Sequence, residues 1–153
     1  ASREKEGAGI ADDLRGHLDS LGSRLDRLEK LLPDALESYR GRLRERVEEA
    51  LEEFDVGDID EERLAQELAY YADKSDVSEE LQRARSHVDE LGEIVDGRRE
   101  EGAVGKTVDF YLQELIRETN TMGSKSHSSD ATDLVIDMKS TVEKMREQAA
   151  NIE

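Results

Sequence analysis

The sequence predicts an all-α fold: an elongated helical bundle with a long coiled-coil-like helix or helical hairpin, followed by about four further helices. Apolar residues recur at steps of three and four along nearly the whole chain, and no segment alternates with the period of a strand. Only 35% of the 153 residues are apolar, whereas 40% are charged. With two Phe and no Trp, the chain has too few large residues for a thick core. Long helices that bury narrow seams need fewer of them.

The longest apolar seam lies in residues 10–54, within a coiled-coil-like segment that we assign to residues 1–56. Steps of three or four residues keep one stripe of a helix facing a partner. Pro33 interrupts the segment, and Pro disfavours helix in the residue before it. The unbroken phase predicts one kinked rod and the Pro predicts two helices, so both remain open. The seam consists of Ile10, Leu14, Leu18, Leu21, Leu25, Leu28, Leu32, Leu36, Tyr39, Leu43, Val47, Ala50 and Phe54.

The remaining helices form a C-terminal helical domain, residues 57–153. Asp60 is expected to cap a helix that begins at Glu61, and Asp76 with Glu79 resembles a capping box for a helix over 78–95. Another helix runs over 104–122 and ends at Gly123 as its C-cap. Polar loops are expected at 96–105 and 124–129, and Asp130 or a nearby Ser caps the last helix. Its seam is predicted to be Ala131, Val135, Met138, Val142, Met145 and Ile152.

Composition restricts the function classes. The absence of Cys excludes disulfides and thiolate metal sites. No apolar run approaches the length of a membrane span and no secretion signal is visible, so we expect a cytoplasmic protein without a membrane partner. The net charge of −17 should repel nucleic acid at long range. Two explanations stay open: a surface adapted to a salty cytoplasm, or basic surface supplied by a domain absent from this chain.

One face of the helix over 104–122 has an unusual composition for a solvent-facing surface. Most exposed faces in this chain carry Glu, Asp and Arg, whereas this face mixes amides, hydroxyls, one Arg and one aromatic ring. Amides and Arg bind phosphates and base edges, and an exposed ring stacks on a base. The alternative is that the face packs on another subunit. Its residues are Phe110, Gln113, Glu114, Arg117, Asn120, Thr121 and Ser124.

The helix over 78–95 carries Glu80, Arg83 and His87 on one stripe, and Asp73 and Asp76 precede it. A carboxylate cluster of this kind can hold a divalent ion through oxygen ligands, and His87 can act as a general acid or base. The alternative is a solvated face with intrahelical ion pairs, such as Glu79 with Arg83.

The loop after the helix over 104–122 contains Lys125 and His127 among several Ser residues. This composition is typical of an anion-binding site before a helix N-terminus. A flexible capped turn explains it equally well. The chain has no phosphate-binding Gly-loop and no nucleophile elbow, which argues against a nucleoside-triphosphate site or a Ser hydrolase.

Three stretches resemble the YicC-like, stress-induced endoribonuclease family. Residues 63–87 read RLAQELAYYADKSDVSEELQRARSH, with the family's ADK-D-SEEL turn followed by R-x-x-SH. Residues 105–126 read GKTVDFYLQELIRETNTMGSKS and are similar to the family's G-x-x-x-DF-x-x-QE-x-x-RE-x-NT-x-GSKS. Residues 143–153, EKMREQAANIE, are close to the family's ending. Lys106-Thr107, Ile116 and Ala150 depart from the family's pattern, which bears on RNA affinity more than on fold.

The resemblance implies a metal-dependent endoribonuclease that cleaves single-stranded RNA and assembles as a homo-oligomer, a hexamer in the full-length protein. It also implies that the family's N-terminal domain is absent from this chain. The alternative function is a non-catalytic RNA-binding, adaptor or oligomerisation module that acts with another nuclease. The expected cofactor is a divalent cation, Mn²⁺ or Mg²⁺.

The motifs carry the candidate site residues. We expect His87, Glu80, Glu114 and Glu118 to be catalytic. The candidate metal ligands are Asp73, Asp76, Glu79 and Glu80. Since neither polar face alone has both a carboxylate cluster and phosphate-binding cations, we also expect the two faces to converge. The candidate RNA-binding residues are Arg83, Phe110, Gln113, Arg117, Asn120, Thr121, Ser124 and Lys125.

Overall fold

The computed structural model describes residues 2–97 and 104–151, and this part of the chain consists of five helices without a strand. The all-α prediction is therefore confirmed. None of these helices combines the length and apolar character needed to cross a membrane. The helices are α1 (Ser2–Phe54), α2 (Glu61–Ser75), α3 (Ser78–Val95), α4 (Val104–Lys125) and α5 (Ser129–Ala149).

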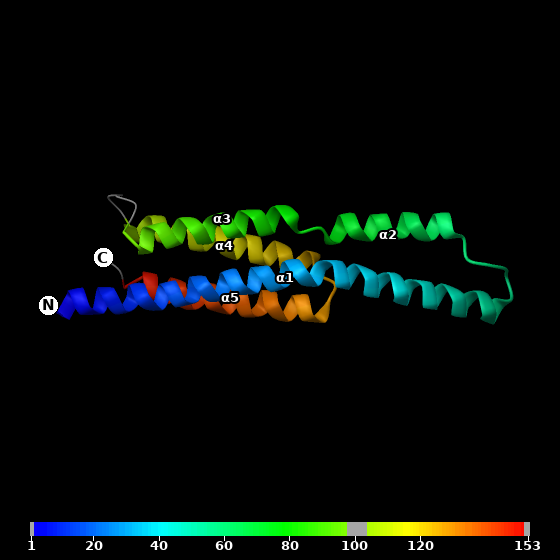
Figure 1. The fold of residues 1–153 in the computed structure, drawn as a ribbon, viewed down its shortest axis with the longest axis horizontal. Coiled ribbons are helices and arrows are strands. Elements are labelled where there is room, and N and C mark those ends of the chain that lie inside the picture. The colour runs from blue at the N-terminus through cyan, green and yellow to red at the C-terminus, as the bar shows by residue number, and fades with distance from the viewer. Residues whose placement is uncertain (1, 98–103, 152–153) are drawn as a thin grey trace.

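Four helical segments form an elongated bundle, and the rest of α1 projects beyond it (Figure 1). The N-terminal part of α1 lies between α3 and α5, and α4 packs against both α3 and α5. The helices are antiparallel in each of these contacts: α1 with α3, α3 with α4, α4 with α5, and α5 with α1 (Figure 1). The C-terminal part of α1 extends past the bundle, and α2 returns alongside it with few contacts (Figure 1). We call this projecting pair, residues 34–75, the arm.

The apolar seam of α1 therefore lies in two different environments. In the bundle its leucines are almost fully enclosed: Leu14, Leu21 and Leu28 are each 1% exposed. In the arm, Leu43 is only half-buried and Phe54 is 68% exposed. The predicted seam is thus confirmed as core packing over residues 14–28, whereas its last positions have little to pack against.

Pro33 lies inside α1, which continues as one helix of 53 residues. Of the two possibilities that the sequence left open, the single rod is correct. At 1.5 Å per residue this helix is about 80 Å long. Packing of the leucine seam against α3 and α5 stabilises the helix before Pro33, and this offsets the hydrogen bond that Pro cannot donate.

Two of the predicted helix boundaries are correct. The Asp60 carboxylate accepts a hydrogen bond from the backbone N–H of Arg63 at 3.2 Å, so Asp60 caps α2. At the start of α5 the cap is Ser128 rather than Asp130, because the Ser128 hydroxyl accepts from the N–H of Ala131 at 3.3 Å. The predicted inward position Ile152 and most of the predicted loop at 96–105 lie outside the described residues.

Two of the predicted helix caps are wrong, although α3 spans residues 78–95 as predicted. Asp76 does not form a capping box with Glu79: its carboxylate accepts instead from the N–H of Ser78 at 3.0 Å, and the N-cap of α3 is the buried Val77. Gly123 does not end α4, which continues to Lys125. A Cβ at Gly123 would lie 3.2 Å from Cγ1 of Val135, so this glycine allows close packing of α4 on α5. The same absence of a side chain had suggested a C-cap.

Candidate active site

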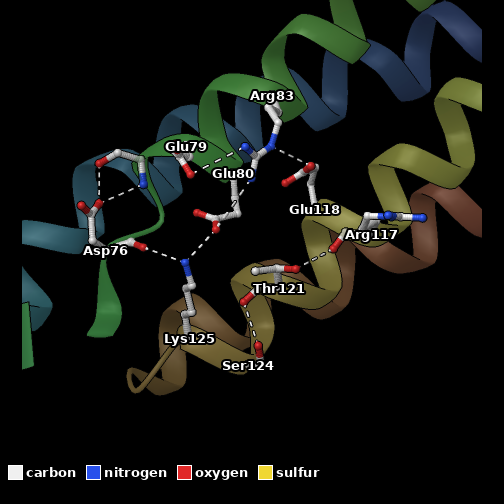
Figure 2. Close-up of polar contacts among 10 residues, drawn as sticks. Asp76, Glu79, Glu80, Arg83, Arg117, Glu118, Thr121, Ser124 and Lys125 are labelled. Carbon is white, nitrogen blue, oxygen red and sulfur yellow. Dashed lines mark hydrogen bonds and ion pairs between the residues drawn. The ribbon is translucent and has the colours of Figure 1, made fainter. Parts of the chain in front are cut away.

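The antiparallel packing of α3 on α4 brings two polar stripes together (Figure 2). On α3, Glu80, Arg83 and His87 share a stripe because residues three or four apart lie on one helix face. Residues of α4 at similar spacing face them. The expectation that the two polar faces converge holds only in part: within one subunit Glu114 meets the stripe of α3, whereas Arg117 of the same predicted face points away from it (Figure 2). The contributing residues of α4 are Glu114, Glu118 and Lys125.

Glu80 is the most deeply buried charged group of this site, at 3% exposure. Lys125 donates to its Oε1 at 2.7 Å, and a guanidinium nitrogen of Arg83 lies 4.0 Å from the same oxygen. The second carboxylate oxygen, Oε2, is buried without a hydrogen-bond partner among the described residues. Burial alone would raise the pKa of Glu80, but the hydrogen bond and charge of Lys125, aided by Arg83, hold that pKa below its usual value. Glu80 is thus an ionised carboxylate inside the bundle.

Glu118 forms the second ion pair between the helices. It is 5% exposed, and the Nε of Arg83 donates to its Oε1 at 2.9 Å (Figure 2). This hydrogen bond and the charge of Glu118 raise the pKa of Arg83 above its usual value. Arg83 also lies 3.7 Å from Glu79, an exposed carboxylate on its own helix. Arg83 therefore holds the Glu118 side chain in position.

Glu118 also belongs to a cluster with His87 and Glu114. A ring nitrogen of His87 and one carboxylate oxygen from each Glu all lie within 4.8 Å of one another. The Nε2 atom of His87 is buried and has no hydrogen-bond partner among the described residues. The ring of Tyr111 lies against that of His87, with centroids 5.7 Å apart. Within residues 2–97 and 104–151, this is the one group of three or more potential ligands that converges closely enough for a metal ion.

The donor set is chemically suitable for a divalent cation. Two carboxylates supply hard oxygen ligands, and an imidazole supplies one nitrogen. A buried, unpaired imidazole nitrogen gains a partner when a cation binds, and negative charge is available to balance the ion. Of the two expected cations, a mixed nitrogen and oxygen site suits Mn²⁺ better than Mg²⁺, which prefers oxygen ligands and water.

The carboxylates predicted from sequence to bind metal are not brought together. Asp73 is exposed on the last turn of α2, and Asp76 is bonded to Ser78 at the break between α2 and α3. Glu79 faces solvent beside Arg83, and Glu80 is bonded to Lys125. Three residues expected to be catalytic, His87, Glu114 and Glu118, converge instead.

Most of the predicted RNA-binding residues of α4 form an accessible surface next to the cluster. Thr121 is half-buried and donates its hydroxyl to the carbonyl of Arg117, whose side chain points away from the ion pairs (Figure 2). The Ser124 hydroxyl donates to the carbonyl of Thr121, and Gln113 donates to Asp109. The exposed members are Phe110, Gln113, Arg117, Asn120 and Ser124.

Arg117 is the cation of this surface available to a ligand. It has no carboxylate within ion-pair distance among the described residues, whereas Arg83 and Lys125 are held by Glu118 and Glu80. The loop at 126–128 is also partly occupied internally, because Ser128 caps α5. Of the predicted phosphate-binding cations, the structure therefore leaves Arg117 the most accessible.

We expect Lys125→Ala to destabilise the protein by roughly 1–3 kcal/mol at pH 7, because it leaves Glu80 ionised and buried with less compensation. Glu80 has a lowered pKa in the folded protein, so it contributes stability above its usual pKa that is lost as pH falls through the lowered value. In the variant that pKa should move up, so the difference between wild type and variant should shrink as pH falls below the ordinary carboxyl range.

Urea denaturation followed by circular dichroism at several pH values measures this effect. Lys144→Ala is the matched control, since Lys144 is an exposed lysine on α5. A difference between wild type and Lys125→Ala that stays constant from neutral to acidic pH would contradict the assignment of Glu80.

Comparison with known proteins identifies relatives over the whole chain. The family model described as "Endoribonuclease YicC-like, C-terminal" matches residues 28–153. A "Probable endoribonuclease YicC" of Clostridioides difficile is 42% identical over 151 residues, covering 99% of this chain and 50% of that protein. A protein of the same name from Haemophilus influenzae is 38% identical over 153 residues, covering 100% of this chain and 50% of its own length. The chain thus spans about half the length of these curated relatives.

Proposed function

The chain belongs to the YicC-like endoribonuclease family, and from this we propose that it forms the metal-binding part of an endoribonuclease that cleaves single-stranded RNA. The observation that carries the proposal is the convergence of a ring nitrogen of His87 with one carboxylate oxygen each of Glu114 and Glu118 to within 4.8 Å. The Nε2 atom of His87 is also buried without a hydrogen-bond partner among the described residues. These three residues would hold Mn²⁺ or Mg²⁺. A bound divalent ion lowers the pKa of its water and stabilises negative charge that develops on a phosphate.

The surrounding residues keep this site in position. Arg83 fixes Glu118 from α3, and Lys125 fixes Glu80 from α4, so two ion pairs join the N-terminal part of α3 to the C-terminal part of α4. Such positioning matters because ligands must be oriented before a cation binds, and partners outside the coordination sphere provide that orientation. We therefore propose that Arg83 and Glu80 are positioning residues. From sequence, Arg83 was expected to bind RNA directly and Glu80 to be catalytic.

The exposed face of α4 is proposed to bind RNA. Arg117 offers an unpaired guanidinium to a phosphate, and Asn120 offers an amide to a phosphate or base edge. Phe110 is 56% exposed and provides a ring on which an unstacked base can lie. Unpaired bases of this kind are available in single-stranded RNA. A cation near this face also offsets part of the repulsion between RNA and a chain of net charge −17.

We further propose that the protein acts in the cytoplasm as a homo-oligomer, a hexamer when complete. The support is the apolar seam toward the end of α1, where Val47 and Leu51 are only half-buried and Phe54 is 68% exposed. A second copy would cover these positions, as coiled-coil seams cover one another.

Cleavage of single-stranded RNA with Mn²⁺, and with chelator added, tests the proposed reaction. We expect cleavage in Mn²⁺, none in chelator, and restoration when Mn²⁺ is returned. A 2′,3′-cyclic phosphate end formed in chelator, together with loss of activity in His87→Ala, would instead indicate metal-free acid–base catalysis by the imidazole. RNA binding without cleavage under any metal condition would favour the adaptor alternative.

A further inference from the structure

A second candidate binding surface lies at the root of the arm, where α1 and α2 meet the loop between α4 and α5. The rings of Tyr39 and Tyr71 stack there with centroids 3.7 Å apart and an angle of 4° between their planes. The ring of His127 lies 5.3 Å from that of Tyr71. Three segments distant in sequence therefore contribute aromatic rings to one place. None of these rings belongs to the cluster of His87, Glu114 and Glu118.

A groove opens along these rings. Its volume is about 450 Å³, within the range of roughly 300–1,000 Å³ typical of ligand sites. Tyr70 lies on its wall and is 58% exposed. The ammonium of Lys74 sits 4.7 Å from the centroid of the Tyr70 ring. The groove thus combines a stacked aromatic floor with an accessible aromatic wall.

The charge of this groove is opposite to that of the chain. Arg42, Arg46 and Lys74 line it together with a single carboxylate, Glu67. Arg42 and Arg46 are exposed, and neither has a carboxylate within ion-pair distance in the described part of the chain. By contrast, Arg44, on the same helix, pairs with Glu61 at 2.7 Å. In a protein of net charge −17, two arginines without a carboxylate partner beside the exposed ring of Tyr70 indicate a binding role.

We propose that this groove, which we call the arm groove, is a second binding site for single-stranded RNA, separate from the cleavage centre. Arg42 and Arg46 would contact phosphates, and Tyr70, with the stacked pair of Tyr39 and Tyr71, would receive bases. Single strands are bound in this way by basic grooves lined with aromatic rings. The proposal rests on RNA being the substrate, but it does not require that this chain cleaves it.

The arm groove is placed so that one RNA strand could reach both it and the proposed cleavage centre. His127 lines the groove, and Lys125, two residues before it, is bonded to Glu80 of the candidate active site. A single strand that leaves the exposed face of α4 at Ser124 would reach the loop at 126–128 and then the groove. The arm would hold a distant part of the same strand, and long RNA would bind more tightly than short RNA.

Binding of fluorescein-labelled oligouridine, measured by anisotropy with chelator present, tests the proposal without depending on cleavage. We expect Arg42→Ala/Arg46→Ala to weaken binding about tenfold and to reduce the slope of log Kd against log salt by roughly 1.4, or about 0.7 per lost phosphate contact. Lys139→Ala/Lys144→Ala removes the same charge from exposed positions of α5 and should leave that slope unchanged.

Tyr70 gives an independent test. Tyr70→Ala should weaken oligouridine binding roughly tenfold because a stacking ring is lost, whereas Tyr70→Phe keeps the ring and should bind as wild type. Tyr70 is exposed, so neither change threatens the core. Unchanged affinity in the arginine variant and in Tyr70→Ala would overturn the proposal. So would a changed molecular mass in light scattering with unchanged RNA affinity, which would assign the groove to a second copy. Weakened binding in a protein that never cleaves RNA would support the groove and reject the proposed reaction.

Discussion

Glu114→Gln is expected to abolish tight Mn²⁺ binding and to lower RNA cleavage at least about 100-fold, since even loss of an outer partner of a metal ligand costs 10–100-fold. The substitution keeps the shape of the side chain and removes the negative charge that balances a divalent cation. Glu114 is a better choice than Glu118, because Glu118 also holds Arg83 at 2.9 Å. A change at Glu118 would combine loss of a ligand with disruption of a buried ion pair.

Mn²⁺ binding followed by calorimetry and cleavage followed on gels measure the effect, with thermal melting to check the fold. Glu79→Gln is the matched control: it lies on the opposing helix, faces solvent and belongs to the metal-binding set expected from sequence. Loss of Mn²⁺ binding in Glu79→Gln but not in Glu114→Gln would reject the cluster in favour of the carboxylates at the start of α3.

Leu25→Ala should lower the free energy of unfolding by about 2–5 kcal/mol, whereas Leu43→Ala should cost much less. Both residues occupy the same predicted seam of the same helix. Leu25 is 2% exposed in the core between α3 and α5, but Leu43 is half-buried in the arm. Leu25→Asp should be more severe and prevent folding, because it places an unpaired charge in that core.

Urea titration of each variant, at one protein concentration, gives the two free energies directly. Light scattering on the same samples reports the oligomer. Equal costs for Leu25→Ala and Leu43→Ala would show that copies bury the arm as fully as the bundle buries its core, and would contradict the division of α1 into two environments.

The helices could be predicted from sequence because each depends on local chemistry. Steps of three and four residues identified the buried faces, and Asp60 identified a helix start through a hydrogen bond that spans three residues. Gly123 was misinterpreted because a glycine is equally suited to a C-cap and to close helix packing. Only the position of Val135, twelve residues later on another helix, distinguishes the two roles.

The composition of the candidate site was predictable, but its geometry was not. His87, Glu114 and Glu118 could be selected from the motifs. Which carboxylates converge on His87 depends on the register of α4 along α3, and helical periodicity within each helix does not give that register. Proximity in sequence instead favoured Asp73, Asp76 and Glu79, which form no ligand cluster of three in the described part of the chain.

The arm groove escaped prediction for the same reason. Tyr39 was predicted only as a seam residue, and His127 as part of a polar loop. One signal was available: Arg occurs at every second position from 40 to 46, in a chain with far more acids than bases. That spacing places the guanidinium groups around the helix, and only the structure distinguishes Arg44, which has a carboxylate partner, from Arg42 and Arg46.

Pro33 lies where α1 leaves the bundle, and this position divides the helix energetically although its backbone is continuous. Because Pro has no N–H, the carbonyl of Glu29 lacks the donor that normally closes its helical turn. Leucine burial also declines here, from 1% exposure at Leu28 to half-burial at Leu32. Proteins open in cooperative units that separate where contacts are sparse. The bundle and the arm should therefore be two such units, with amide hydrogens of the arm exchanging with solvent long before those of residues 14–28.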